Sequence, residues 1–180
     1  MVDNESPTWG DITGDGKPEI ICSSKGLYGY ASPDWNDAAK PWKFHPISPN
    51  NNYHKFTHGL GIGDVNSDGK MDLLERSGWW EQPSSVEGDP QWKYHATSFV
   101  PPKSEGSAQM YAYDVNGDGL ADVVTSLAAH NYGLGWWEQL KEKNDKGEPT
   151  FKLHQILGRT PADNKYGVCF AQLHAVDLVD

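Results

Sequence analysis

A short acidic loop occurs three times in this chain of 180 residues. Its first acids, Asp11, Asp64 and Asp114, lie 53 and 50 residues apart. Each copy has oxygen-bearing side chains at alternate positions, a glycine in the sixth place and an acid in the ninth. Repeats with a period near fifty residues are typical of propeller blades. The loop therefore predicts a fold built from repeated units.

The residues of the loop also predict what it binds. Carboxylate and amide oxygens at every second position can converge on one hard cation, and the glycine permits the sharp turn between them. The carbonyl of the seventh residue, Leu120 in the third copy, can add a ligand. This is the oxygen-only chemistry of a Ca²⁺ site.

Each loop lies among four segments that predict strands. An alternating segment such as 108–113 precedes the loop, and an apolar pair such as Val123-Val124 follows it. The third segment is Gly-Trp-Trp-Glu-Gln at 78–82 and 135–139, with a weaker copy at 26–30. The fourth segment of each unit ends in a histidine, and these are His45, His95 and His154. Four antiparallel strands per unit is the plan of a propeller blade, so we predict an all-β fold.

These strands and loops resemble the FG-GAP / VCBS repeat family, in particular its bacterial FG-GAP-like branch. The resemblance covers essentially the whole chain and implies a β-propeller that carries calcium. It implies weaker binding in the first loop, where Thr13 and Glu19 depart from the pattern. Lys17, Lys70 and Leu120 would contribute their backbone carbonyls. The full set of implied ligands is Asp11, Thr13, Asp15, Lys17 and Glu19; Asp64, Asn66, Asp68, Lys70 and Asp72; and Asp114, Asn116, Asp118, Leu120 and Asp122.

The repeat units span about 6–48, 57–98 and 107–157, and a fourth begins at 168–180. Closed propellers need about four to eight blades. We therefore expect one partial propeller of three blades plus the first strand of a fourth, with the remaining blades missing from this chain.

Three other interpretations of the loops can be compared with a propeller Ca²⁺ site. Glu75 occupies the twelfth place of an EF-hand counted from Asp64, but the glycine-rich flanks, such as 59–63, cannot form its helices. A pair of dockerin-type loops would also need helices and a shorter repeat. The third alternative is a set of Asx-turns without metal, but a cation is favoured because three carboxylates in one turn would repel each other without it. Calcium bound there is expected to be structural, because the loop only joins two strands of one blade.

The paired tryptophans, Trp79-Trp80 and Trp136-Trp137, could stack on sugars or pack between blades. Adjacent strand residues face opposite sides, so at most one of each pair could serve as a sugar platform, and packing is favoured. The three repeated histidines have a fixed strand position, which indicates an architectural role. Their spacing does not predict a zinc site.

In four antiparallel strands, the connections alternate between the two ends of the sheet. The acidic loops join the first and second strands and lie at one end. The links with less repetitive polar residues, between the second and third strands and between units, lie at the other end. A ligand site, if present, is expected at this second end, and its candidate residues are His58, His130, Asn131, Tyr132 and His174. Cys22 and Cys169 could pair, but buried free thiols are favoured because they belong to the first and fourth units.

Composition excludes some partners. The formal net charge of −10, without a basic stripe, argues against nucleic acid, and no apolar run is long enough to span a membrane. Residues 1–5 do not form a signal peptide. We expect a non-catalytic, calcium-stabilised module that binds a protein or glycan in an extracellular, cell-surface or periplasmic setting. The alternative is the propeller domain of a polysaccharide lyase or hydrolase, although no nucleophile motif or poised carboxylate pair supports it.

Overall fold

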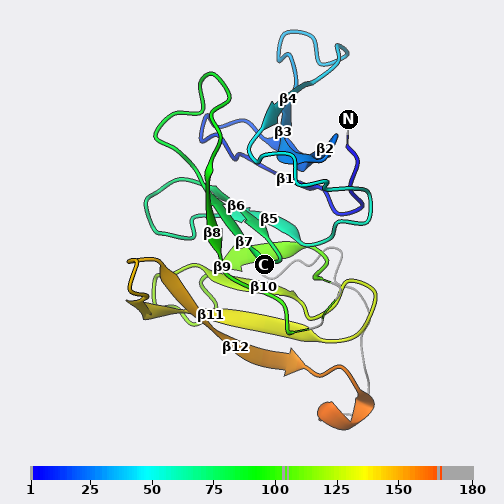
Figure 1. Ribbon diagram of the computed structural model, residues 1–180, viewed down its shortest axis with the longest axis vertical. Coiled ribbons are helices and arrows are strands. Elements are labelled where there is room, and N and C mark those ends of the chain that lie inside the picture. The colour runs from blue at the N-terminus through cyan, green and yellow to red at the C-terminus, as the bar shows by residue number, and fades with distance from the viewer. Residues whose placement is uncertain (1, 103, 105, 166, 168–180) are drawn as a thin grey trace.

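The computed structural model describes residues 2–102, 104, 106–165 and 167, and within them it contains three four-stranded antiparallel sheets (Figure 1). The first sheet consists of β1 (Thr8–Gly10), β2 (Glu19–Ser24), β3 (Leu27–Ser32) and β4 (Lys43–Pro46). The second consists of β5 (Leu60–Gly63), β6 (Asp72–Glu75), β7 (Gly78–Glu81) and β8 (Lys93–Ala96). The third consists of β9 (Met110–Tyr113), β10 (Asp122–Ser126), β11 (Leu134–Lys143) and β12 (Pro149–Leu157). A short 3-10 helix, η1 (Pro161–Asp163), follows. The predicted all-β class is confirmed.

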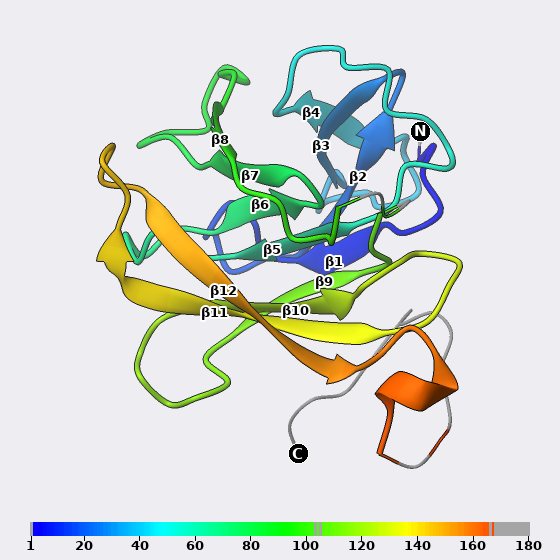
Figure 2. The same ribbon diagram turned by 60° about the horizontal axis from the view of Figure 1, so that its bottom comes forward.

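In every sheet the strands pair in chain order, and the first strands of the three sheets lie near one another (Figure 2). Leu60 at the start of β5 forms a parallel bridge with Gln109, just before β9. The Gln109 side chain also donates to the Pro7 carbonyl, just before β1, at 3.3 Å. The starts of the three first strands are therefore in direct contact.

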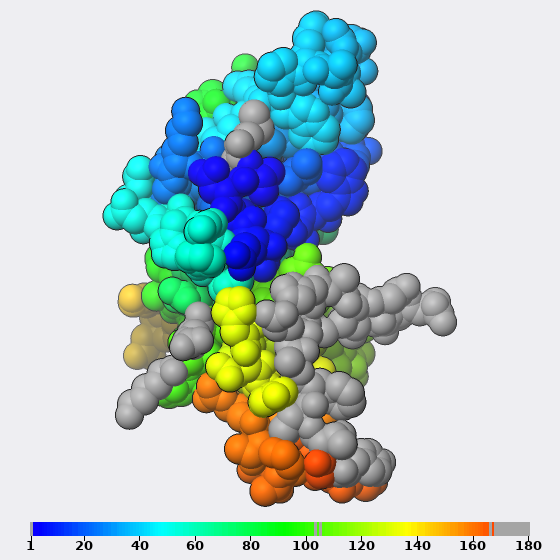
Figure 3. All heavy atoms as spheres, turned by 90° about the vertical axis from the view of Figure 1, so that its right-hand side faces the viewer, coloured from blue at the N-terminus to red at the C-terminus, as the bar shows by residue number. Residues whose placement is uncertain are grey.

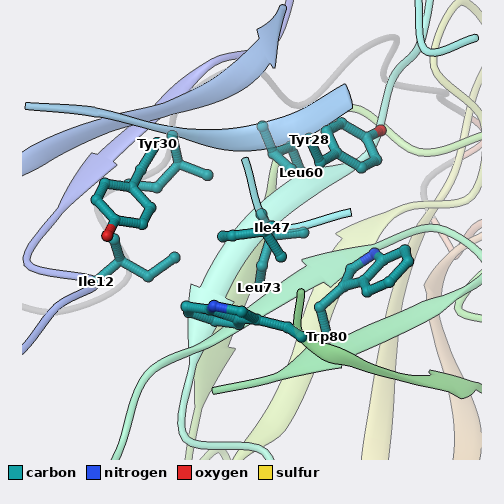
Figure 4. Close-up of a cluster of buried hydrophobic side chains, with 9 residues drawn as sticks. Ile12, Tyr28, Tyr30, Ile47, Leu60, Leu73 and Trp80 are labelled. Atoms are coloured by element: carbon teal, nitrogen blue, oxygen red, sulfur yellow. The ribbon is translucent and has the colours of Figure 1, made fainter. Parts of the chain in front are cut away.

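One hydrophobic core fills the space between the first and second sheets (Figure 4). Ile21, Tyr28 and Tyr30 of the first sheet meet Leu73 and Trp80 of the second, and all five side chains are buried. The period-two alternation of strands places these residues on one side of each sheet.

A second core lies between the second and third sheets. Leu74 and Trp79 of the second sheet pack with Val123 and Trp137 of the third, around a fully buried Phe99. Trp79 and Trp80 therefore face opposite sides of the same sheet, and each belongs to a different core. The sugar-platform interpretation is wrong for these two tryptophans and for Trp137, because all three are buried.

Two buried glutamines connect neighbouring sheets. The Gln139 side-chain amide donates to the Val65 carbonyl at 2.8 Å and to the Ala121 carbonyl at 3.1 Å. In the same way, the Gln82 amide donates to the carbonyls of Ile12 and Met71. The glutamine of each Trp-Trp-Glu-Gln segment thus ties its own sheet to the acidic loop of the preceding sheet.

The third strand of the third sheet is longer than its repeated segment at 135–139. β11 continues to Lys143, and the turn to β12 occupies 144–148. Asn144 closes this turn, because its side-chain oxygen accepts the backbone N–H groups of Lys146 and Glu148.

The predicted fourth unit at 168–180, with Cys169 and His174, lies outside the described residues. Cys22 is fully buried, and burial raises the pKa of its thiol to about 11. Across the part of the chain that is described, the structure contains no helix with the length and apolarity needed to cross a membrane.

Candidate metal-binding loops

The three acidic loops join the first and second strands of their sheets and adopt the same backbone turn. The sixth-place glycines, Gly16, Gly69 and Gly119, have φ angles of 82°, 84° and 88°. Residues with a Cβ rarely adopt this left-handed region, so the glycine is needed for the turn, as predicted. In Figure 2 the loops project from the same side of the molecule.

The first acid of each loop organises the turn. Asp114 accepts the backbone N–H groups of Gly117, Asp118 and Gly119 at 2.7, 3.0 and 2.8 Å. These amides, that of Gly119 foremost, hold the pKa of the Asp114 carboxyl below its usual value even though desolvation acts in the opposite direction. Asp11 accepts the three equivalent amides of its own loop, and Asp64 accepts those of Asp68 and Gly69.

The ninth-place acid is buried and closes the loop against its sheet. Asp72 accepts the backbone N–H of Val65 at 3.0 Å and that of Gln82 at 2.9 Å, and it is fully buried. Burial raises the pKa of Asp72 to about 7, although both amides act in the opposite direction. Asp122 makes the same pair of contacts, and Glu19 accepts the N–H of Ile12. Burial likewise raises the pKa of Glu19 to about 7. These acids therefore have a structural role whether or not a cation binds.

The donor set of the loops fits a hard cation. The backbone N–H of Asp68 donates to both Asp64 Oδ1, at 2.9 Å, and Asn66 Oδ1, at 3.0 Å. The third loop repeats this convergence. In the first loop the Thr13 hydroxyl is buried, with no hydrogen-bond partner among the described residues. In the second and third loops, side-chain oxygens of the first and third positions thus gather around one backbone amide, and they are of the type that Ca²⁺ prefers.

Two features of the loops differ from a closed ion site. The Lys70 ammonium pairs with Asp68 at 2.8 Å, which places a positive charge beside the second loop. Within the described residues, no loop brings three acids together so that their ligand atoms all lie within 4.8 Å of one another. A bound ion would therefore draw the carboxylates inward and compete with Lys70 in the second loop.

The three repeated histidines have the architectural role that their spacing predicted. Each imidazole stacks on an aromatic ring of the neighbouring strand: His45 on Tyr30, His95 on Trp79 and His154 on Trp136. The interplanar angles of the first two pairs are 7° and 8°.

Two of these histidines also reach the next sheet. His45 Nδ1 contacts Asp89, which lies between β7 and β8. His95 lies between Glu81 of its own sheet, at 2.7 Å, and Glu148 of the β11–β12 turn, at 2.9 Å. A histidine and an acid therefore bridge each pair of neighbouring sheets.

The bridge predicts a stability loss at acidic pH. The His45 hydrogen bond is the main cause that lowers the pKa of Asp89 below its usual 3.8. Because the folded-state pKa is depressed, the stabilisation is present above the unfolded value and is lost as pH falls through the folded value. Asp89→Asn should cost no more than about 1 kcal/mol near neutral pH, since the pair is partly exposed. Thermal melts from neutral to strongly acidic pH should show the wild type and this variant converging.

Glu87→Gln is the matched control for this prediction. Glu87 is an exposed acid on the same β7–β8 link, and among the described residues its carboxylate forms no hydrogen bond to a histidine. A difference between Asp89→Asn and wild type that persists at the acidic end would contradict the role assigned to the Asp89 charge.

The opposite end of the sheets carries the links predicted to form a ligand face. A pocket of about 310 Å³ lies between the link 47–59 and the β6–β7 turn, and its lining is Asn51, Asn52, Tyr53, His54, Thr57, Glu75, Arg76 and Ser77. Tyr132 and Asn131 are exposed on the β10–β11 loop. His58 and His130 come together, with their Nε2 atoms 2.9 Å apart.

Several of these contacts were not predicted from the sequence. The glutamine bridges had a signal, because Gln82 and Gln139 occupy the same place in two repeated segments. Glu5 had none: it lies outside the repeats, yet its carboxylate is 3.7 Å from His58 Nε2.

No protein-family model matches this chain, and the comparisons with curated proteins and with solved structures also found no match.

Proposed function

We propose that the three sheets are blades of a β-propeller of the FG-GAP / VCBS type, stabilised by calcium and used to bind a protein or glycan outside the cytoplasm. The observation that carries this proposal is the equivalence of the units. Each sheet has four strands in chain order, the same acidic loop between its first two strands, and the same histidine–aromatic stack between its last two.

The calcium part of the proposal rests on the loops. Their oxygens already converge around backbone amides, and their sixth-place glycines hold the turn that brings the oxygens together. The second and third loops are the stronger sites, and the first is weaker because Thr13 and Glu19 depart from the pattern. An ion here links the first two strands of a blade and so stabilises the fold rather than switching it.

The binding part of the proposal rests on the other end of the sheets. The pocket beside the link 47–59 is lined mainly by amide, hydroxyl and charged groups together with the Tyr53 ring. Such groups can hydrogen-bond hydroxyls and stack on a sugar ring, and they also suit a polar protein loop. Screening the chain against a glycan array, with Tyr53→Ala and Arg76→Ala as variants, addresses this part of the proposal.

Calorimetric titration with Ca²⁺ tests the calcium part. Wild-type protein should bind two ions tightly and a third more weakly, and Asp68→Ala and Asp118→Ala should each remove one tight ion. The reason is that the fifth-place carboxylate is a direct ligand in this loop chemistry.

Asp163→Ala serves as the control, because Asp163 is an exposed acid of η1, on the opposite side of the molecule from the acidic loops (Figure 2). It should bind as many ions as the wild type. An unchanged number of ions in the Asp68→Ala/Asp118→Ala double variant would show that the loops are metal-free Asx-turns.

A further inference from the structure

Glu5, His58 and His130 converge at the end of the sheets opposite the acidic loops. Glu5 precedes β1, His58 precedes β5, and His130 lies on the β10–β11 loop, so the three residues come from separate parts of the chain. One ligand atom from each lies within 4.8 Å of the other two. His58 Nε2 is 2.9 Å from His130 Nε2 and 3.7 Å from Glu5 Oε2.

The surrounding backbone holds these ligands in place. His58 is buried, and its neighbour Gly59 has a φ of 82° in a position where a Cβ would meet Ser107 and Arg76. The backbone N–H of Glu5 donates to the Lys55 carbonyl at 3.0 Å, which ties the N-terminal segment to the link 47–59. The cluster therefore has one buried, fixed ligand and two exposed ligands through which an ion can enter.

We propose that Glu5, His58 and His130 bind a divalent transition metal ion of the Zn²⁺ class. Two imidazole nitrogens and one carboxylate oxygen are ligands that Zn²⁺ prefers, whereas Ca²⁺ takes oxygen ligands alone. Ligands about 2.0–2.2 Å from a tetrahedral ion lie roughly 3.3 Å from one another. The observed separations of 2.9 and 3.7 Å fall on either side of this value.

The two imidazoles face each other through the same atom, Nε2. Two Nε2–H groups cannot both point at each other, so either one proton or one cation must lie between the rings. The carboxylate directed at the same point adds a negative charge, which favours a cation of higher charge.

Among the described residues the cluster supplies three ligands, so a four-coordinate ion keeps one position for water or another exchangeable ligand. Zinc sites with three protein ligands are typically of this open kind. Figure 3 shows this end of the molecule, with the N-terminal segment in dark blue, the link 47–59 in cyan and the loop 127–133 in yellow. The open position therefore lies on the same end as the polar pocket and is available to a carboxylate or hydroxyl of an incoming molecule.

Titration with Co²⁺, followed by its visible absorption, and competition with Zn²⁺ test this site in the presence of saturating Ca²⁺. The wild-type chain should bind one equivalent of either metal at this cluster, with the spectrum of low-coordinate Co²⁺. Loss of an outer-shell partner costs about 10–100-fold in metal affinity, so losing a direct ligand in His130→Gln or Glu5→Gln should cost at least about 100-fold. Both substituted residues are exposed, so these variants should fold.

His54→Gln is the matched control, because His54 is an exposed histidine on the same link as His58 but outside the cluster. It should bind Co²⁺ and Zn²⁺ like the wild type. Wild-type protein that folds but binds no stoichiometric Zn²⁺, or binding that is equal in wild type, His130→Gln and Glu5→Gln, would overturn the proposal. Calcium binding should be the same in all four proteins, so the result is independent of the acidic loops.

Discussion

Removal of Ca²⁺ from the proposed loop sites should lower the melting temperature of this protein more than most single substitutions would. An ion that binds only the folded state stabilises it by about 2.7 kcal/mol when its concentration is a hundred times its dissociation constant. Two filled loops would then contribute about 5 kcal/mol, which corresponds to roughly 10–20 °C for a chain of this size. Thermal melts with excess Ca²⁺ and after chelation measure the difference.

Adding the ion back identifies the sites responsible. Excess Ca²⁺ should restore the melting temperature, whereas Mg²⁺ should restore little, because it demands a smaller octahedral site and keeps most of its water. The Asp68→Ala/Asp118→Ala double variant should melt at nearly the same temperature with and without Ca²⁺. A wild-type melting temperature that does not respond to chelation would contradict a stabilising role for calcium.

Trp79→Ala should destabilise the fold by about 3–5 kcal/mol, the range for removing a large aromatic side chain from a core. Trp79 is 1% exposed, belongs to the core between the second and third sheets, and stacks on His95 with a centroid distance of 4.1 Å. Its loss would leave a cavity between two sheets and remove one side of the His95 bridge. Chemical denaturation of wild type and variant measures the free energy of unfolding.

Trp136→Ala is the matched comparison, because Trp136 occupies the same place in the repeated segment and stacks on His154 in the same way. Trp136 is only partly buried and is not part of the core between the second and third sheets. Its replacement should therefore cost clearly less than that of Trp79. Equal losses would mean that the stack on histidine, rather than packing between sheets, determines the contribution of this tryptophan.

The repeated residues made most of the fold predictable. Alternating apolar residues, the acidic loops and the Gly-Trp-Trp-Glu-Gln segments predict four strands per unit, because the signals recur at fixed spacing. The contacts between units were less accessible. Glu148, for example, meets His95 only because β11 and β12 extend beyond the expected strands and carry the turn 144–148 to the second sheet.

The site residues likewise fall into those that the repeats predict and those that only contacts between units bring together. The proposed loop ligands are close in sequence, so their spacing alone predicts them. His58 and His130 are 72 residues apart, and Glu5 lies outside any repeat, so their convergence depends on how three segments pack at one end of the sheets. Periodicity describes each unit but does not specify which irregular links of different units meet.

The bridges between sheets are directional. His45 of the first sheet contacts Asp89, which lies in the second unit. The Ile12 carbonyl of the first unit accepts a hydrogen bond from Gln82 of the second. The second and third sheets repeat the pairing with His95, the Val65 carbonyl, Glu148 and Gln139. The second sheet therefore carries both sets of contact residues, one set on each side. A gene that duplicates or loses one whole unit keeps every bridge matched, so unit number can change in evolution without new contact chemistry.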